Sequence, residues 1–322
     1  MQVMERVESL PKSFNNIATN ESFEIRIPAS IANLGPGFET LAVAVQLYVN
    51  LRVERLRGNG RLHFAGSGRD AARVEAAFRY LAGENAARVP SLSVEVSNEI
   101  PFHAGLGRRA ALTVAGLRLY EAIARPVSIQ KMLQSASALG CQAENAAASL
   151  LGGLTLTCRL SDGVMHAAKF PWPERLGLVL VTPSVARNGE EAPALLPNLV
   201  SRADLVFNLQ RVALLLQSLR SSEFSLLKHA LDDRVHQPFR ESAIPGFAEA
   251  LALQHRDLLG ICLSGSGPSI VALAERNTWE IGELLAGIYR RAGIDYRLRI
   301  LDAHQEISAL PQIFRSGLLC CS

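Results

Sequence analysis

Apolar and polar residues along the chain follow two periods, one typical of strands and one typical of helices. Predicted strands cover residues 23–28, 48–56, 92–97, 154–157, 178–181, 260–264, 269–274 and 296–301. Predicted helices cover residues 69–81, 109–124, 129–151, 203–218, 224–229, 247–253 and 279–291. Strands and helices mix without a strict βαβ order, so the pattern predicts an α+β protein with two lobes.

The same pattern suggests where the chain divides. Residues 1–22 show no sustained period and are expected to form a flexible tail. The strand at 23–28 leads into a turn-rich segment around 34–37. We interpret the start of the fold as a strand followed by a loop and then by a helix. A second half begins near Arg175, so the predicted lobes are residues 23–174, which contain a glycine-rich loop, and residues 175–322.

Composition excludes several classes of protein. With 322 residues, of which 48% are hydrophobic, the chain can bury a large core. Its 33 Lys and Arg nearly balance 30 Asp and Glu and form no basic stripe, which argues against nucleic acid as the main ligand. No apolar run approaches the roughly 20 residues that cross a membrane, so we expect a cytoplasmic protein. The five cysteines lack zinc-site spacing and are interpreted as reduced thiols.

Two glycine-rich segments are candidates for ligand binding in the first half. Residues 28–39 read PASIANLGPGFE, and glycines on both sides of a proline allow a tight turn that leaves Asn33 and Glu39 to point into a cavity. Residues 100–111 read IPFHAGLGRRAA and place a glycine loop at the start of a predicted helix. Backbone N–H groups there, together with the helix dipole, suit a phosphate.

A third segment, LSGSGPS at residues 263–269, lies between two predicted strands. Its alternating glycines would let the backbone approach another loop or a ligand closely. Taken alone, each of these segments could be an ordinary turn or hairpin.

Together and in this order, the three segments resemble the motifs of the GHMP small-molecule kinases, and most closely those of homoserine kinases. The family patterns are PASSANLGPGFD and PxxxGLGSSAA, and the similarity extends over roughly residues 23–304. The resemblance implies a ribosomal S5 domain 2-like N-terminal lobe and a ferredoxin-like C-terminal lobe. It also implies phosphorylation by ATP, with Mg²⁺, of the hydroxyl of homoserine or a similar small amino alcohol.

The resemblance also implies roles for individual residues. Substrate would be bound by Asn33, Asn145 and Arg240, although a surface salt bridge would equally explain Arg240. The catalytic residues would be Glu39 and Glu144, and Glu144 would also be the metal ligand. Phosphate would meet the backbone of Gly105, Leu106, Gly107, Arg108, Arg109 and Ala110. The third motif, with Gly265, Ser266 and Gly267, would brace the other two.

The chain departs from the family pattern where phosphate and metal are handled. Arg108 and Arg109 replace two serines, and Gly140 replaces the metal-binding glutamate. Because a guanidinium is larger than a serine hydroxyl and permanently charged, we expect at least one to enter the phosphate and Mg²⁺ space. Glu144, one turn later on the predicted helix, is then the local replacement for the lost carboxylate.

Two functional hypotheses follow. The chain is an active kinase that uses ATP and Mg²⁺, or it is a non-catalytic descendant that needs neither. In the second case the arginine pair would bind a small anionic metabolite or pair with Glu144, or the chain would serve a protein partner. A homodimer is compatible with both. His103, His236 and Cys141 do not form a recognisable catalytic set for a different reaction.

Overall fold

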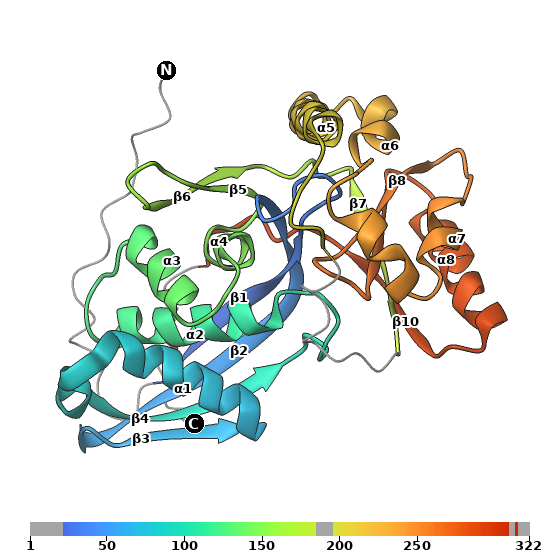
Figure 1. Ribbon diagram of the computed structural model, residues 1–322. Coiled ribbons are helices and arrows are strands. Elements are labelled where there is room, and N and C mark those ends of the chain that lie inside the picture. The colour runs from blue at the N-terminus through green and yellow to red at the C-terminus, as the bar shows by residue number, and fades with distance from the viewer. Residues whose placement is uncertain (1–21, 185–195, 309–312, 315–322) are drawn as a thin grey trace.

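The computed structural model describes residues 22–184, 196–308 and 313–314. Nearly all of the predicted tail, together with Cys320 and Cys321, lies outside these ranges. Two sheets organise the described chain (Figure 1). This agrees with the α+β class expected from the sequence.

The first sheet has the strand order β11-β1-β2-β4-β3, and β5 pairs with both β2 and β6. Its strands are β1 (Ser22–Ala32), β2 (Leu41–Asn59), β3 (Leu62–Gly66), β4 (Pro90–Asn98), β5 (Leu154–Arg159), β6 (Met165–Phe170) and β11 (Ile313–Phe314). The prediction of a helix after the 34–37 turn is wrong, because β2 begins at Leu41 and runs antiparallel to β1. Residues 41–45 are buried on both faces, which removed the alternation by which a strand is recognised.

Four helices cover one face of this sheet (Figure 1). They are α1 (Gly68–Ala82), α2 (Arg108–Ile123), α3 (Ile129–Ala138) and α4 (Ala143–Leu151), and a 3₁₀ turn, η1 (Gly83–Arg88), follows α1. The single helix predicted over 129–151 is wrong: Gly140, with φ of 77°, ends α3, and the chain turns before α4. Gly140 therefore lies in a turn, and Glu144 lies in the first turn of a separate helix.

The second sheet is antiparallel, with the order β10-β7-β9-β8. Its strands are β7 (Gly177–Pro183), β8 (Leu258–Leu263), β9 (Ile270–Ala274) and β10 (Tyr296–Leu301). Its helices are α5 (Arg202–Ser221), α6 (Leu227–Ala230), α7 (Phe247–Leu251) and α8 (Thr278–Ala292), with 3₁₀ turns η3 (Phe224–Leu226), η4 (Gln237–Phe239) and η5 (Glu241–Ala243). Within the described ranges, no helix is both long and apolar enough to cross a membrane.

The chain returns to the first sheet after β10. Ala303 bridges to Val45 of β2, and β11 pairs with the start of β1. The segment after β10 therefore connects the second sheet to β2 by backbone contacts, in addition to the loops described next.

Candidate functional site

The turn after β1 is built from residues in left-handed backbone conformations. Asn33, Leu34 and Gly35 have φ of 74°, 44° and 72°. A Cβ on Gly35 would lie 2.5 Å from the carbonyl oxygen of Leu231, so the turn packs directly on the second lobe. Asn33 is buried, and its Oδ1 accepts a hydrogen bond from the backbone N–H of Glu39 at 3.1 Å. Asn33 thus shapes the turn, while the side chain of Glu39 is exposed.

The second segment forms the expected glycine loop, and α2 begins directly after it at Arg108. Gly105 and Gly107 have φ of 72° and 64°. A Cβ on Gly105 would meet the carbonyl oxygen of Ser264 at 2.3 Å, and one on Gly107 would meet Ser30 Oγ at 2.1 Å. Both positions therefore require glycine. The free N–H groups of the first turn of α2 follow immediately, and that turn carries no acidic residue.

The third segment braces the first two. Ser264 Oγ donates to the carbonyl oxygen of Gly105 at 2.8 Å, and Ser269 Oγ donates to that of Ala104 at 2.6 Å. The N–H of Gly265 donates to the carbonyl oxygen of Ala32 at 3.0 Å. The structure therefore brings together three segments that the sequence singled out separately.

The start of α4 adds an acid–amide pair to this assembly. Ser30 Oγ donates to Asn145 Oδ1 at 2.8 Å, and Asn145 Nδ2 donates to Glu144 Oε1 at 3.1 Å. A Cβ on Gly107 would also lie 2.8 Å from Asn145 Oδ1, so the helix start of α2 contacts this pair. Glu144 and Asn145 therefore lie beside the glycine loop, as the resemblance implied.

Burial, reinforced by the neighbouring charge of Glu39, raises the pKa of Glu144 from its ordinary value of 4.5 to about 7. Hydrogen bonds from its own backbone and from Asn145 oppose this shift. Glu144 is 2% exposed. It therefore changes between proton donor and proton acceptor near neutral pH, which is the property required of a general acid or base.

This pKa shift makes the stability of the fold depend on pH. Because the folded protein holds the Glu144 proton up to pH about 7 and the unfolded chain releases it near 4.5, the stabilising contribution is complete below 4.5 and is lost as pH rises through 7. The expected loss is on the order of 3 kcal/mol. Urea unfolding of wild type and Glu144→Gln between pH 5 and 8 would measure it as the difference in pH slope.

The comparison with Glu144→Gln is needed because His236 acts in the opposite direction. Burial lowers the pKa of His236 from 6.5 to about 4, so its contribution to stability grows as pH rises from 4 to 6.5. The contribution of His236 is present in both wild type and Glu144→Gln, so it cancels in the comparison. Equal pH slopes for the two proteins would contradict the raised pKa of Glu144.

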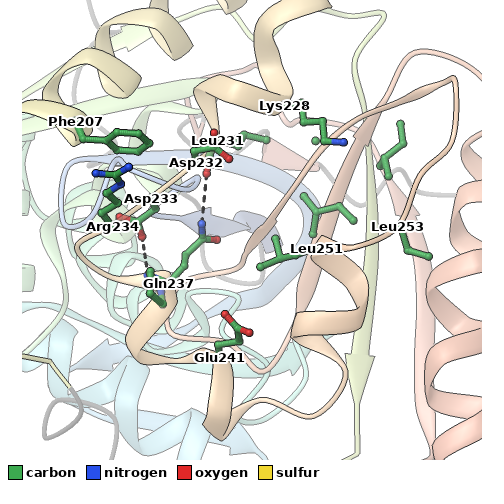
Figure 2. Close-up of a pocket in the computed structure, with 14 residues that line it drawn as sticks. Phe207, Lys228, Leu231, Asp232, Asp233, Arg234, Gln237, Glu241, Leu251 and Leu253 are labelled. Carbon is green, nitrogen blue, oxygen red and sulfur yellow. Dashed lines mark hydrogen bonds between the residues drawn. The ribbon is translucent and has the colours of Figure 1, made fainter. Parts of the chain in front are cut away.

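Residues 233–240 form a loop that positions Arg240. Asp233 accepts hydrogen bonds from three backbone N–H groups of the loop and from Asn208 Nδ2 of α5. Gln237 Nε2 donates to the carbonyl oxygen of Leu231 (Figure 2). Gln237 Oε1 accepts from the N–H of Leu263 at 2.8 Å. Hydrogen bonds thus hold the loop to both α5 and β8.

A separate cavity of about 350 Å³ lies on this part of the second lobe. Phe207, Lys228 and Glu241 are among the residues that line it (Figure 2). On the same loop, Arg240 is buried, and its Nε lies 3.4 Å from His236 Nε2. Phe38, beside Glu39 in the first turn, stacks on His236 with 4.6 Å between ring centroids. Arg240 therefore does not lie on the surface, where the salt-bridge alternative had placed it.

The sequence assigned no role to His236, which lies four residues before Arg240. With its pKa lowered by burial, it is uncharged at neutral pH and can accept the Arg240 N–H. Arg240, His236 and Phe38 connect the second lobe to the turn that carries Glu39.

The side chains of the two arginines after the glycine loop have different partners. Arg108 donates to the carbonyl oxygen of Ile100 and pairs with Asp70, and its guanidinium carbon lies 3.7 Å from the centre of the Phe102 ring. Arg109 Nη1 donates to the carbonyl oxygen of Gly140 at 3.1 Å. Arg109 thus places a cation where the family pattern has the metal-binding carboxylate, whereas Arg108 is held by Asp70 and Phe102. The expectation that a guanidinium enters the phosphate and Mg²⁺ space stays a prediction. Among the described residues, neither arginine forms an ion pair with Glu144.

A cavity of about 690 Å³ opens beside the glycine loop and extends between the lobes. Its lining includes Asp70, Asn98, Phe102 and Arg108 from the first lobe and Thr182 and Arg297 from the second. This volume is within the range of small-molecule and cofactor sites.

Comparisons with known proteins identify the family and the fold. The family model for the GHMP kinase N-terminal domain matches residues 72–153, which include the glycine loop and α4. The homoserine kinase of Solibacter usitatus is 36% identical, over 86% of this chain and 93% of the relative. That of Schizosaccharomyces pombe is 30% identical, over 88% of this chain and 96% of the relative.

Solved structures share the fold. The crystal structure of homoserine kinase from Cytophaga hutchinsonii superposes with a TM-score of 0.76 at 24% identity and covers 92% of this chain and 98% of its own. A mevalonate kinase superposes with a TM-score of 0.63 at 11% identity, with coverage of 88% and 99%. The two-lobed GHMP fold expected from the motifs is confirmed. The chain therefore belongs to the homoserine kinase family of the GHMP kinases.

Proposed function

We propose that this protein transfers the γ-phosphoryl group of ATP to the side-chain hydroxyl of homoserine. The observation that carries the proposal is the contact between the glycine loop and the acid–amide pair. Gly107, at the start of α2, packs against Ser30 and Asn145, and Asn145 is hydrogen-bonded to Glu144. A phosphate at the start of α2 and a hydroxyl beside Glu144 would therefore be neighbours.

The glycine loop and the 690 Å³ cavity suit a nucleotide. Backbone N–H groups at the start of α2, together with the helix dipole, would bind the phosphates. The cavity that opens beside the loop has room for the ribose and the base. Phe102 lies on the wall of this cavity, where it is 53% exposed and offers an aromatic surface.

The acceptor substrate would lie between Glu144 and Arg240. A buried guanidinium such as that of Arg240 suits the carboxylate of an amino acid. In the reaction, the hydroxyl oxygen bonds to the γ-phosphorus, the bond from this phosphorus to the β–γ bridging oxygen breaks, and ADP leaves. Glu144 in its carboxylate form accepts the proton of the hydroxyl. Glu39 contributes by raising the pKa of Glu144 towards neutrality.

The side chains around the loop do not fit a magnesium site built by the protein. Mg²⁺ usually takes one or two carboxylates in addition to phosphate oxygens. Gly140 supplies no side chain, the Arg109 cation lies against its carbonyl oxygen, and Glu144 is partly protonated near neutral pH. In the described part of the chain, no group of three His, Cys, Asp or Glu residues could hold a metal ion. We therefore assign the cationic role near the phosphates to Arg109 and the start of α2.

Incubation of the purified protein with ATP, Mg²⁺ and homoserine tests the proposal. We expect ADP and a phosphorylated product in equal amounts, and ATP binding by calorimetry in the absence of homoserine. Omission of homoserine is the control, because water alone should give much less ADP. Absence of both ADP formation and ATP binding would overturn the proposal.

The second candidate is a non-catalytic descendant. The observation that favours it is the Arg109 guanidinium beside Gly140, where the family pattern has a carboxylate. On this hypothesis the calorimeter would detect binding of a small anion such as phosphate at the start of α2, and no ADP would form with homoserine.

A further inference from the structure

A closed network surrounds the guanidinium of Arg108. Arg108 pairs with Asp70 and donates to the carbonyl oxygen of Ile100. Asn98 joins these two partners, because its Nδ2 donates to Asp70 Oδ2 at 3.2 Å and its Oδ1 accepts the N–H of Ile100 at 2.9 Å. The ring of Phe102 covers the guanidinium at 3.7 Å. The network links the start of α1, the end of β4 and the start of α2.

The position of Asp70 explains why this network is strong. Asp70 lies in the first turn of α1, where the helix dipole favours a negative charge, and it is 3% exposed. A buried carboxylate needs a charged or hydrogen-bonding partner, which Arg108 and Asn98 supply. Glu75, five residues later on α1, also pairs with an arginine, Arg79, but this pair is more open to solvent, with 34% of the Glu75 side chain and 50% of the Arg79 side chain exposed.

The backbone and side chain of Arg108 have different surroundings. Its backbone begins α2 at the mouth of the glycine loop, directly after Gly107. Its side chain turns back along the loop to Phe102 and Asp70, on the wall of the 690 Å³ cavity. Without Asp70 as a partner at that wall, the long cationic side chain of Arg108 would reach the mouth of the glycine loop.

We propose that Asp70 is a positioning residue that holds the Arg108 guanidinium against Phe102 and so keeps the mouth of the glycine loop open. The part of this proposal that concerns nucleotide rests on the proposed kinase function. The anchoring of Arg108 itself does not depend on it.

Chemical modification tests the anchoring without nucleotide. The full chain is treated with phenylglyoxal, and modification of Arg108 is followed by peptide mass spectrometry in wild type, Asp70→Asn and Glu75→Gln. We expect Arg108 to react at least fivefold faster in Asp70→Asn than in wild type, and Glu75→Gln to leave its rate unchanged. Equal rates at Arg108 in wild type and Asp70→Asn would overturn the proposal, whatever the catalytic assays show.

Kinetics tests the consequence for the loop. In Asp70→Asn we expect the KM for ATP to rise at least tenfold and the KM for homoserine to stay within twofold of wild type. The double variant Asp70→Asn with Arg108→Ser should recover most of the ATP affinity, because the released guanidinium is gone. Thermal melting of each variant confirms that the folded fractions are equal.

The outcomes separate this proposal from the kinase proposal. If wild type binds ATP but Asp70→Asn raises both KM values together, or if removal of Arg108 recovers no ATP affinity, the positioning role is wrong and the kinase function stands. If wild type binds no ATP, the kinase function is wrong, and the modification rates alone decide whether Asp70 anchors Arg108.

Discussion

Replacing Glu144 with Gln should lower kcat for phosphorylation of homoserine by about 10²- to 10⁴-fold, the usual effect of removing a general base. The amide has nearly the same shape and can still bond with Asn145, but it cannot accept a proton from the substrate hydroxyl. Since the pKa of Glu144 is about 7, kcat/KM of wild type should rise as pH increases through 7. In Glu144→Gln this rise should be absent.

The control for this variant is Glu95→Gln. Glu95 is an exposed carboxylate on β4, so its loss should leave kcat unchanged. Activity would be measured from pH 5.5 to 8.5, with ATP binding followed in parallel to show that the nucleotide site is intact. A folded Glu144→Gln protein with kcat within threefold of wild type would exclude Glu144 as the base.

Gly107→Ala should both destabilise the protein and reduce its activity. At φ of 64° an alanine is strained by about 1 to 2 kcal/mol. The added Cβ would also lie 2.1 Å from Ser30 Oγ, which is fully buried, so the bond between Ser30 and Asn145 must shift. We expect a loss of about 2 to 5 kcal/mol in total. Displacement of α2 from Glu144 should reduce kcat on the order of 10²-fold.

Gly163→Ala is a matched control for Gly107→Ala. Gly163 has φ of 82°, but a Cβ there would meet nothing within 4 Å. Its replacement therefore measures backbone strain alone, about 1 to 2 kcal/mol, with no effect on kcat. Urea unfolding and steady-state kinetics of the two variants give the comparison. If both variants lose the same stability and neither loses activity, the contact of Gly107 with Ser30 does not organise the site.

Locally encoded features were well predicted from sequence. The three glycine-rich segments were recognised because residues in left-handed conformations and close backbone contacts require glycine, and this requirement is visible in the residue types. Helix α1 and strand β4 were predicted to within two residues, since each has one buried face and one exposed face. Strand β2 was missed over its first half because tertiary packing buries both of its faces there.

Local residue types did not predict in which direction the long side chains point. They also did not predict the pKa values of buried groups. The Arg108 side chain lies between Phe102 and Asp70 because Asp70, 38 residues earlier, is brought beside it by the packing of α1 on α2. Asn33 turned out to support the backbone of Glu39, which residue type alone does not indicate.

The sequence by itself determined the family, the α+β class and the backbone of the glycine loops, because these depend on residue types and their order. Only the tertiary structure decided that Arg108 is held at Asp70, that Arg109 lies against the carbonyl oxygen of Gly140 and that the pKa of Glu144 lies near 7. The physical reason is that the direction of a charged side chain and the free energy of its ionisation depend on partners and burial supplied by distant parts of the chain.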